Sequence, residues 1–221
     1  MIFYASPVSS YSAKVRIVLR AKHIAFEERL PPGGYRSAAY REIVPMGTLP
    51  AIDDAGFVLS ESEVINEYLE ERFPQPAMLP RSHEARARTR FFARFHDLYL
   101  EPPVRALFGH IAPAKRDLPF VAGRAAEILR RASQLSQMAQ PQPYLATSFL
   151  SLADCGYAVT LPLARRLLEV LDQPISLPPN IAEWEAMLQA DPAVADALLP
   201  WRAATDTWLR TQLAAPGNSP S

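Results

Sequence analysis

Strand patterns are confined to the first sixty residues, and this restriction constrains the fold more than any other feature of the chain. The strand candidates are residues 2–4, 26–30, 49–53 and 57–59, of which 26–30 has charged residues between two apolar ends. Asp54-Ala55-Gly56 is a typical hairpin turn between the last two runs. Helical patterns at residues 10–22, 37–43 and 60–73 complete the order β-α-β-α-β-β-α. This order predicts a small mixed sheet covered by helices.

Beyond Pro74-Gln75-Pro76 the chain has only helical patterns. Helices are expected at residues 82–108 and 118–139, from Ser151, from Asn180, after Asp191-Pro192, and over Trp201–Leu213. Prolines mark most of the junctions. The sequence therefore predicts an α+β protein of two domains, residues 1–76 and residues 83–214, followed by a disordered tail at residues 215–221.

The composition excludes several classes of function. The 23 basic and 23 acidic residues cancel, so the chain has no bulk charge that would attract nucleic acid or an anionic membrane. No apolar run approaches the roughly 20 residues of a membrane helix, and no signal peptide is recognisable. Cys155 is the only cysteine, and the four histidines form no i, i+4 pair, so we expect neither a disulfide nor a metal site. These features favour a cytoplasmic protein.

Four segments, each weak alone, follow one another in a specific order. They are Ser9-Ser10-Tyr11-Ser12-Ala13-Lys14-Val15-Arg16, Val44-Pro45-Met46-Gly47-Thr48-Leu49-Pro50-Ala51-Ile52, Ser60-Glu61-Ser62 and Leu150-Ser151-Leu152-Ala153-Asp154. Serines before helices are usually N-caps. Ser60 with Glu63, and Ser151 with Asp154, each fit a capping box.

Together the four segments resemble the cytosolic glutathione transferase family over nearly the whole chain. The first is similar to the serine-containing helix start of zeta- and theta-class members, and the second to the family's Asn-Pro-x-x-x-Val-Pro segment, with Val44 in place of the asparagine. Glu61-Ser62 looks like the family's Glu/Gln-Ser pair. The resemblance implies a thioredoxin-like N-terminal domain over residues 1–76 and an all-helical substrate and dimerisation domain over residues 83–214.

The resemblance also implies a role for Ser9. Only a few per cent of a free cysteine thiol is ionised at neutral pH, and the thiolate is the nucleophile. A hydroxyl that donates to the sulfur, together with the positive end of the following helix, favours the ionised form of glutathione. The family pattern assigns this hydroxyl to Ser9, and Ser10 remains the alternative because the loop can be aligned one residue later.

The remaining contacts with glutathione are also implied by the resemblance. In the family the second proline of the Pro-x-x-x-Val-Pro segment is cis, which here is Pro50. Thr48, Leu49 and Pro50 are then expected at the cysteinyl backbone, and Glu61 and Ser62 at the γ-glutamyl group. The glycyl carboxylate requires a basic or polar side chain; Tyr35, Arg36 and Arg41 are candidates, and Arg36 is preferred.

The helical domain is expected to complete the site. Its central helix carries the Ser151 capping box, which implies a buried Cys155. A second substrate is expected between the domains. Candidate lining residues are Tyr11, Phe95, His96, Tyr99 and Arg105. The long helix that contains several arginines forms the two-fold interface in the family, which implies a homodimer.

The predicted function is a glutathione transferase, typical of detoxification, whose activated thiolate attacks an electrophilic small molecule. A glutathione-dependent isomerase similar to maleylacetoacetate isomerase is an alternative, although Tyr11 stands where the zeta pattern has a cysteine. A dehalogenase or an ether-cleaving enzyme is another. The alternative from a different class is a binding or regulatory protein of the same fold without catalysis. The sequence does not identify the electrophile.

Overall fold

The sheet expected in the first sixty residues is present. The computed structural model describes residues 1–141 and 143–215, so the expected disordered tail lies outside the described residues except for Ala215. The strands are β1 (Ile2–Tyr4), β2 (Glu27–Arg29), β3 (Ala51–Asp54) and β4 (Phe57–Ser60). They form one sheet in the order β2-β1-β3-β4. β1 is parallel to β2, while β1–β3 and β3–β4 are antiparallel.

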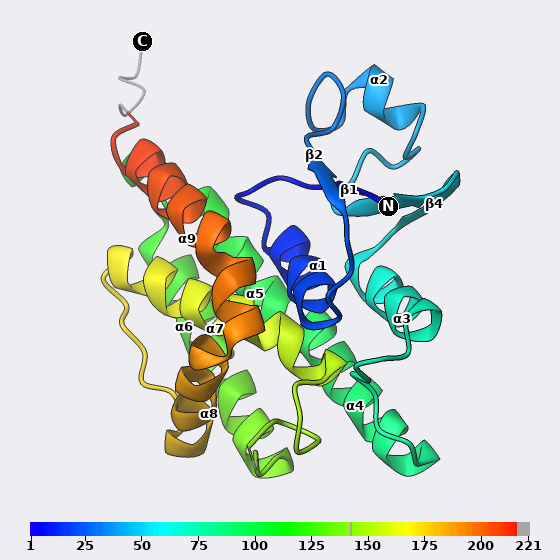
Figure 1. The fold of residues 1–221 in the computed structure, drawn as a ribbon. Helices are drawn as coiled ribbons and strands as arrows, with labels where there is room; N and C mark the ends of the chain where they lie inside the picture. Colours follow the sequence, from blue (N-terminus) through cyan, green and yellow to red (C-terminus); the bar gives the residue numbers. More distant parts are fainter. Residues whose placement is uncertain (142, 216–221) are drawn as a thin grey trace.

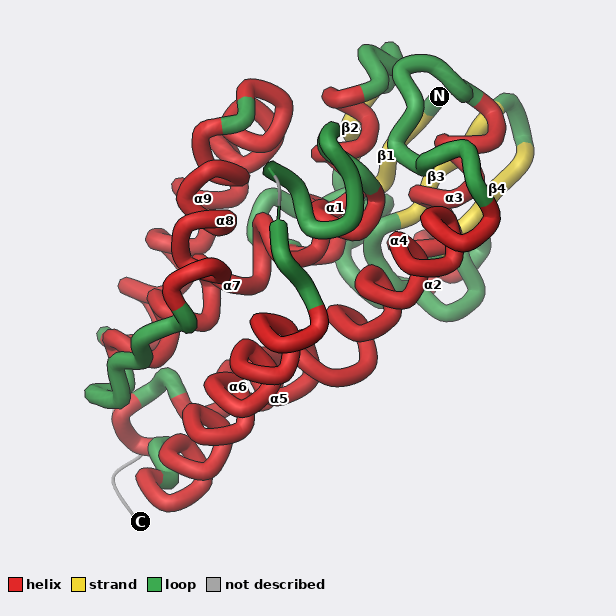
Figure 2. Tube along the Cα trace, turned by 90° about the horizontal axis from the view of Figure 1, so that it is seen from below, coloured by secondary structure: helices red, strands yellow, loops and turns green. Residues whose placement is uncertain are grey.

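Most of the remaining described residues are helical, and loops connect the helices (Figure 2). In the first part these are α1 (Ser10–Ala21), α2 (Ala38–Arg41) and α3 (Ser62–Arg72). The later ones are α4 (His83–Phe95), α5 (Glu101–Ala106), α6 (Leu118–Met138), α7 (Leu152–Val170), α8 (Pro179–Ala190) and α9 (Pro192–Leu213). Short 3-10 turns cover Leu107–His110 and Pro113–Lys115. No helix in the described residues is long and apolar enough to cross a membrane.

The predicted fold class, a βαβαββα unit followed by an all-helical part, is confirmed. Three details differ. The helix expected over residues 82–108 contains a π-helical turn, His96–Leu100, between α4 and α5. The two helices expected after Asp191-Pro192 and over Trp201–Leu213 are one, since α9 continues through Pro200.

The third difference concerns the start of α3. The capping box predicted for Ser60 and Glu63 is wrong, because Ser60 ends β4 and the N-cap is Glu61, with φ of 75° and no side-chain capping bond. The Glu63 carboxylate instead lies 2.6 Å from the Lys14 ammonium. Leaving the buried Lys14 ammonium unpaired would cost more free energy than losing a capping bond, because water can replace the capping bond.

Helix α1 connects the two parts of the molecule. It packs against α3 on one side and against α7 and α9 on the other, as Figure 1 shows. Val15, Ile17, Val18 and Leu19 are all fully buried. Apolar side chains therefore face both directions, so α1 belongs to both hydrophobic layers and fixes one against the other.

Helix α7 is the centre of the helical part, and its predicted capping box is present. Asp154 accepts hydrogen bonds from the Ser151 and Leu145 backbone N–H groups and from the Trp184 indole. Burial raises the pKa of the Asp154 carboxyl to about 6, although these donors oppose the shift. Cys155 follows it and is fully buried, as expected.

The π-helical turn crosses α7 at a glycine. A Cβ added to Gly156 would lie 2.5 Å from His96 Nδ1. The His96 ring is buried, and its Nε2 lies 2.8 Å from the Thr160 hydroxyl. The ring therefore fits against α7 because Gly156 has no side chain.

We predict that Gly156→Ala lowers the free energy of unfolding by about 1–3 kcal/mol, since the His96 ring is held from two sides and cannot move aside freely. Denaturant unfolding measures the change. Gly123→Ala in α6 is the control: its Cβ meets nothing within 4 Å, so a gain of about 0.5–1 kcal/mol is expected from helix propensity. Equal effects of the two substitutions would contradict this account of the crossing.

Candidate functional site

Three loops leave the sheet at one edge. Tyr4, at the end of β1, is paired with Ala51, at the start of β3, and Ala51 is paired in turn with Ser60, at the end of β4. The segments that join this row are residues 5–9, residues 48–50 and residues 61–62. The sheet register therefore brings the first three sequence motifs to a common edge, although they are separated by tens of residues in the chain.

Ser9 is the N-cap of α1. Its hydroxyl oxygen accepts a hydrogen bond of 3.1 Å from the Ser12 backbone N–H. A hydroxyl that accepts in this way keeps its own proton available for a further acceptor. Ser9 is half-buried and stands at the positive end of a helix of 12 residues, where a negative charge is stabilised.

Ser10 has a different environment. Its side chain is 5% exposed, and its hydroxyl oxygen accepts a hydrogen bond of 2.5 Å from the Arg105 guanidinium. Arg105 also bonds to Glu101, and the Tyr11 hydroxyl donates to the same carboxylate at 2.8 Å. Burial, followed by the Glu101 charge, raises the pKa of Tyr11 well above its usual value.

The second and third loops offer mostly backbone groups. The Leu49–Pro50 peptide bond is cis, as the resemblance implied. Leu49 is half-buried and lies two residues before the start of β3. The Thr48 hydroxyl is buried and has no hydrogen-bond partner among the described residues. Glu61 is exposed at the α3 N-terminus, and Ser62, the first residue of that helix, is buried.

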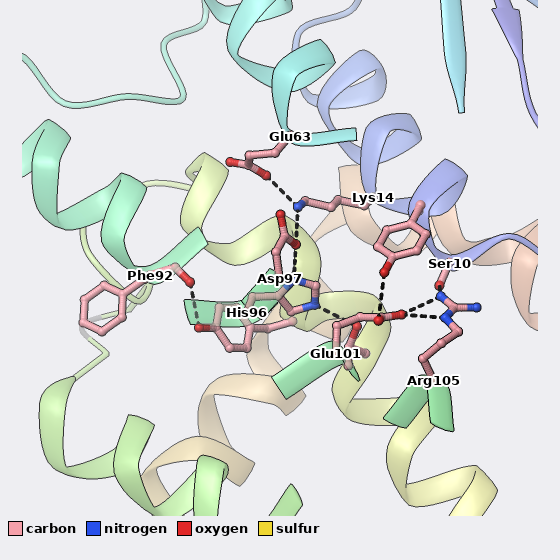
Figure 3. A network of polar contacts seen from close by, with 11 residues as sticks. Ser10, Lys14, Glu63, Phe92, His96, Asp97, Glu101 and Arg105 are labelled. Atoms are coloured by element: carbon pink, nitrogen blue, oxygen red, sulfur yellow. Dashed lines mark hydrogen bonds and ion pairs between the residues drawn. The ribbon is translucent and has the colours of Figure 1, made fainter. Parts of the chain in front are cut away.

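A buried ion-pair cluster connects these helix starts to the helical part (Figure 3). Lys14 of α1 is 2% exposed, and its ammonium lies 2.6 Å from Glu63 and 2.9 Å from Asp97. His96 Nδ1 lies 2.7 Å from the same Asp97 oxygen. Burial opposes ionisation of Asp97, but the hydrogen bond from His96 and the charge of Lys14 outweigh it and hold the pKa of the carboxyl well below its usual range.

Sequence reasoning missed this cluster. A lysine at position 14 follows the apolar pattern of α1 without interrupting it, and Asp97 lies more than eighty residues away. One signal in the sequence could have indicated the cluster: Lys14 lies among apolar residues on a helix that is expected to be buried. A buried cation requires carboxylates close to it. Nothing local identified which carboxylates these are.

The structure does not bring the five expected residues of the second-substrate pocket together. Tyr11 and Arg105 lie beside Ser10, with the guanidinium 4.9 Å from the Tyr11 ring centre. Phe95 and Tyr99 instead line a hollow of about 500 Å³ between α4 and α6. His96 is enclosed in the core.

Arg36 is exposed in the loop before α2, with φ of 61° and its guanidinium over the Tyr35 ring at 5.1 Å. Within the described residues no group of three or more His, Cys, Asp or Glu side chains is arranged to hold a metal ion. Independently of this, the loop N–H and C=O groups at the sheet edge are suitable partners for an organic ligand with backbone-like amides.

Comparison with known proteins agrees with this geometry. Residues 3–77 match the family described as glutathione S-transferase, N-terminal domain. A stringent starvation protein A homolog of Pasteurella multocida is 34% identical over 172 residues, which cover 77% of this chain and 76% of that protein. The holo structure of a maleyl pyruvate isomerase, described as a bacterial zeta-class glutathione S-transferase, superimposes with a TM-score of 0.72 at 25% identity. It covers 89% of this chain and 96% of that one.

A glutathione S-transferase of Pseudomonas putida is also similar to the chain. It is 30% identical over 158 residues, and the match covers 71% of each protein. The resemblance inferred from the four motifs is thereby confirmed across both parts of the molecule. The chain belongs to the glutathione S-transferase family.

Proposed function

We propose that the protein binds glutathione at the sheet edge and activates its thiol for attack on an electrophilic small molecule. Residues 1–76 form the glutathione-binding domain, and residues 83–214 supply the surface for the second substrate. Ser9 donates to the sulfur. Leu49 and Pro50, with Thr48 behind them, face the cysteinyl backbone, Glu61 and Ser62 hold the γ-glutamyl end, and Arg36 holds the glycyl carboxylate.

One observation carries this proposal: Ser9 has an uncommitted hydroxyl proton on a half-buried side chain at the N-terminus of α1, whereas Ser10 is buried and Tyr11 has already donated its proton. Ser10 accepts from Arg105, and Tyr11 donates to Glu101. Of the three residues, Ser9 is therefore the one best able to donate to a thiolate that the helix dipole also stabilises. The uncommitted buried Thr48 hydroxyl adds a polar group for the ligand backbone.

The second substrate is placed beside Tyr11 and Arg105 in this proposal. Arg105 is half-buried, and its guanidinium lies over the rings of Tyr11 and Phe108, at 4.9 and 4.5 Å from their centres. This arrangement offers the second substrate two aromatic rings and one guanidinium, which is paired with Glu101. The matched solved structure is that of a maleyl pyruvate isomerase of the zeta class, which makes isomerisation through a glutathione adduct the alternative to transfer.

A homodimer is supported by the exposed apolar surface over β4, α3, α4 and the π-helical turn. Its members are Phe57, Val64, Phe91, Leu98 and Tyr99, each 45% exposed or more. Large apolar side chains left exposed on neighbouring elements are typical of an interaction site. We also assign the protein to the cytoplasm. Its single cysteine, Cys155, is free and buried, which is in keeping with a reducing compartment.

The second candidate is a binding or regulatory protein that holds glutathione without turning it over. It is favoured by one finding, the 34% identity to a stringent starvation protein A homolog, whose name specifies no reaction. Glutathione binding without thiolate formation in the unaltered protein would favour this candidate over the transferase.

We predict that Ser9→Ala retains glutathione binding but loses the ultraviolet absorbance of the bound thiolate, with a fall in turnover of about tenfold to a thousandfold from one lost donor. Calorimetric titration with glutathione and difference absorbance measure the two effects. Ser10→Ala is the matched control and should leave the thiolate signal in place. Loss of the signal in Ser10→Ala alone would assign the role to that serine.

We predict that Glu63→Gln weakens glutathione binding about threefold to tenfold, because the Lys14–Glu63 pair holds the start of α3 against α1 and that pair is nearly buried. The control is Glu67→Gln, one turn later on α3, whose partner Arg90 is partly exposed; a change of less than about twofold is expected there. Calorimetry measures both constants. An equal loss of glutathione affinity in the two variants would contradict a positioning role for Glu63.

We predict that Phe91→Glu dissociates the dimer, weakening association by about thirtyfold or more, the loss that roughly 2 kcal/mol at an interface produces. Phe91 is 50% exposed, so the monomer should stay folded. Phe120→Glu on α6 is the control, since Phe120 is 37% exposed and stacks on His110 away from this surface. Sedimentation velocity over a concentration series compares the two; dimerisation unchanged in Phe91→Glu would place the interface elsewhere.

A further inference from the structure

Two prolines lie inside the paired helices α7 and α9. Pro162 interrupts the middle of α7 and Pro200 the middle of α9. A proline removes one helical hydrogen bond and bends the helix away from the carbonyl four residues before it. For Pro162 this carbonyl belongs to Ala158, and it accepts instead from the Gln189 side chain at 2.8 Å.

A pocket of about 250 Å³ opens between the two helices at this level. Pro162 and Leu163 of α7 and Trp201 of α9 give it apolar walls, and Arg166, Arg202 and Asp206 are its charged residues. The Gln189 side chain also accepts a hydrogen bond of 2.6 Å from Arg202. One amide therefore donates to the Ala158 carbonyl and positions the Arg202 guanidinium at the pocket.

Two buried polar groups of this pocket have no hydrogen-bond partner among the described residues: the indole N–H of Trp201 and the hydroxyl of Thr205. Both side chains line the pocket, and they are only 3% and 6% exposed. Their spacing of four residues puts them on one face of α9. A buried polar group without a partner is destabilising, and native proteins retain few of them without a ligand, a water or a functional reason.

The solvent side of the pocket is spanned by an ion pair. Arg166 Nε of α7 lies 3.6 Å from Asp206 Oδ1 of α9, and both side chains are about half exposed. Arg166 also contacts Glu169 at 3.0 Å. An exposed pair of this length contributes little to stability, so a competing carboxylate can replace Asp206 as the partner of Arg166 and open the way to the buried donors.

We propose that this pocket is a binding site for a small organic acid, separate from the glutathione site. The carboxylate of the ligand takes the place of the Asp206 carboxylate beside Arg166 and accepts from Trp201 or Thr205. The apolar body of the ligand lies against Pro162, Leu163 and the indole. The lining offers four donor groups and one carboxylate, which matches a ligand that is rich in acceptors and carries a negative charge.

The test uses the full chain and sodium benzoate as the probe. The chain has three tryptophans, so three indole N–H signals are expected in a nitrogen–proton correlation spectrum; Trp201→Phe identifies that of Trp201. We expect this signal to shift saturably with benzoate, while that of Trp184, which is bonded to Asp154, stays in place. A Trp201 signal that does not respond to millimolar benzoate would overturn the proposal.

Two variants define the site further. Thr205→Val keeps the shape and removes the hydroxyl, and Arg166→Gln removes the cation; each should weaken benzoate binding about tenfold, the effect of one lost hydrogen bond to a charged group. Thr207→Val and Arg210→Gln, on the same helix but outside the pocket, are the controls and should bind as before. Thermal unfolding verifies that all four are folded. Undiminished binding in both pocket variants would contradict the assignment.

Two further probes test the class of ligand. Benzyl alcohol has the apolar body without the charge, and inorganic phosphate has the charge without the body. Both should bind at least about tenfold more weakly than benzoate, because each forfeits one of the two kinds of contact. Equal or tighter binding of either probe would overturn the assignment to an organic acid.

Discussion

The arrangement of this molecule depends on one buried ammonium group. Lys14 sits in α1 with 2% of its side chain exposed, and a lone cation in such a place would be strongly unfavourable. Glu63 from α3 and Asp97 from the π-helical turn neutralise it, one from each part of the molecule. Removing one partner of a buried pair typically costs about 3–5 kcal/mol. The two layers that meet at α1 are therefore held by charge as well as by apolar packing.

The candidate site follows from that arrangement. The N-termini of α1 and α3 are the proposed places for the thiolate and the γ-glutamyl carboxylate, and the Lys14–Glu63 pair links these two helices. Asp97 and His96 extend the same cluster to Thr160 of α7. Ser9 has no side-chain contact with this cluster and is connected to it only through the backbone of α1.

Much of the fold was predictable because it rests on local patterns. The alternation of apolar residues, the Asp54-Ala55-Gly56 turn and the Asp191-Pro192 helix start located strands and helices within a few residues. The failures occurred where a distant partner overrode a local signal. Ser60 has a good capping sequence, but Glu63 is bonded to Lys14. Residues 96–100 have an ordinary helical pattern, but the turn widens into a π-helix where His96 packs on Gly156.

For the candidate site, the sequence by itself determined the fold class, the family and the order of the three loop motifs, since these depend on residue types and short spacings. Tertiary structure decided what those residues can do. It buried Ser10 beside Arg105, committed the Tyr11 proton to Glu101, left Ser9 half-buried with its proton uncommitted, and separated Phe95 and Tyr99 from the other expected pocket residues. The physical reason is that hydrogen bonding and burial depend on contacts between residues that are distant in sequence. These contacts form only in the folded chain.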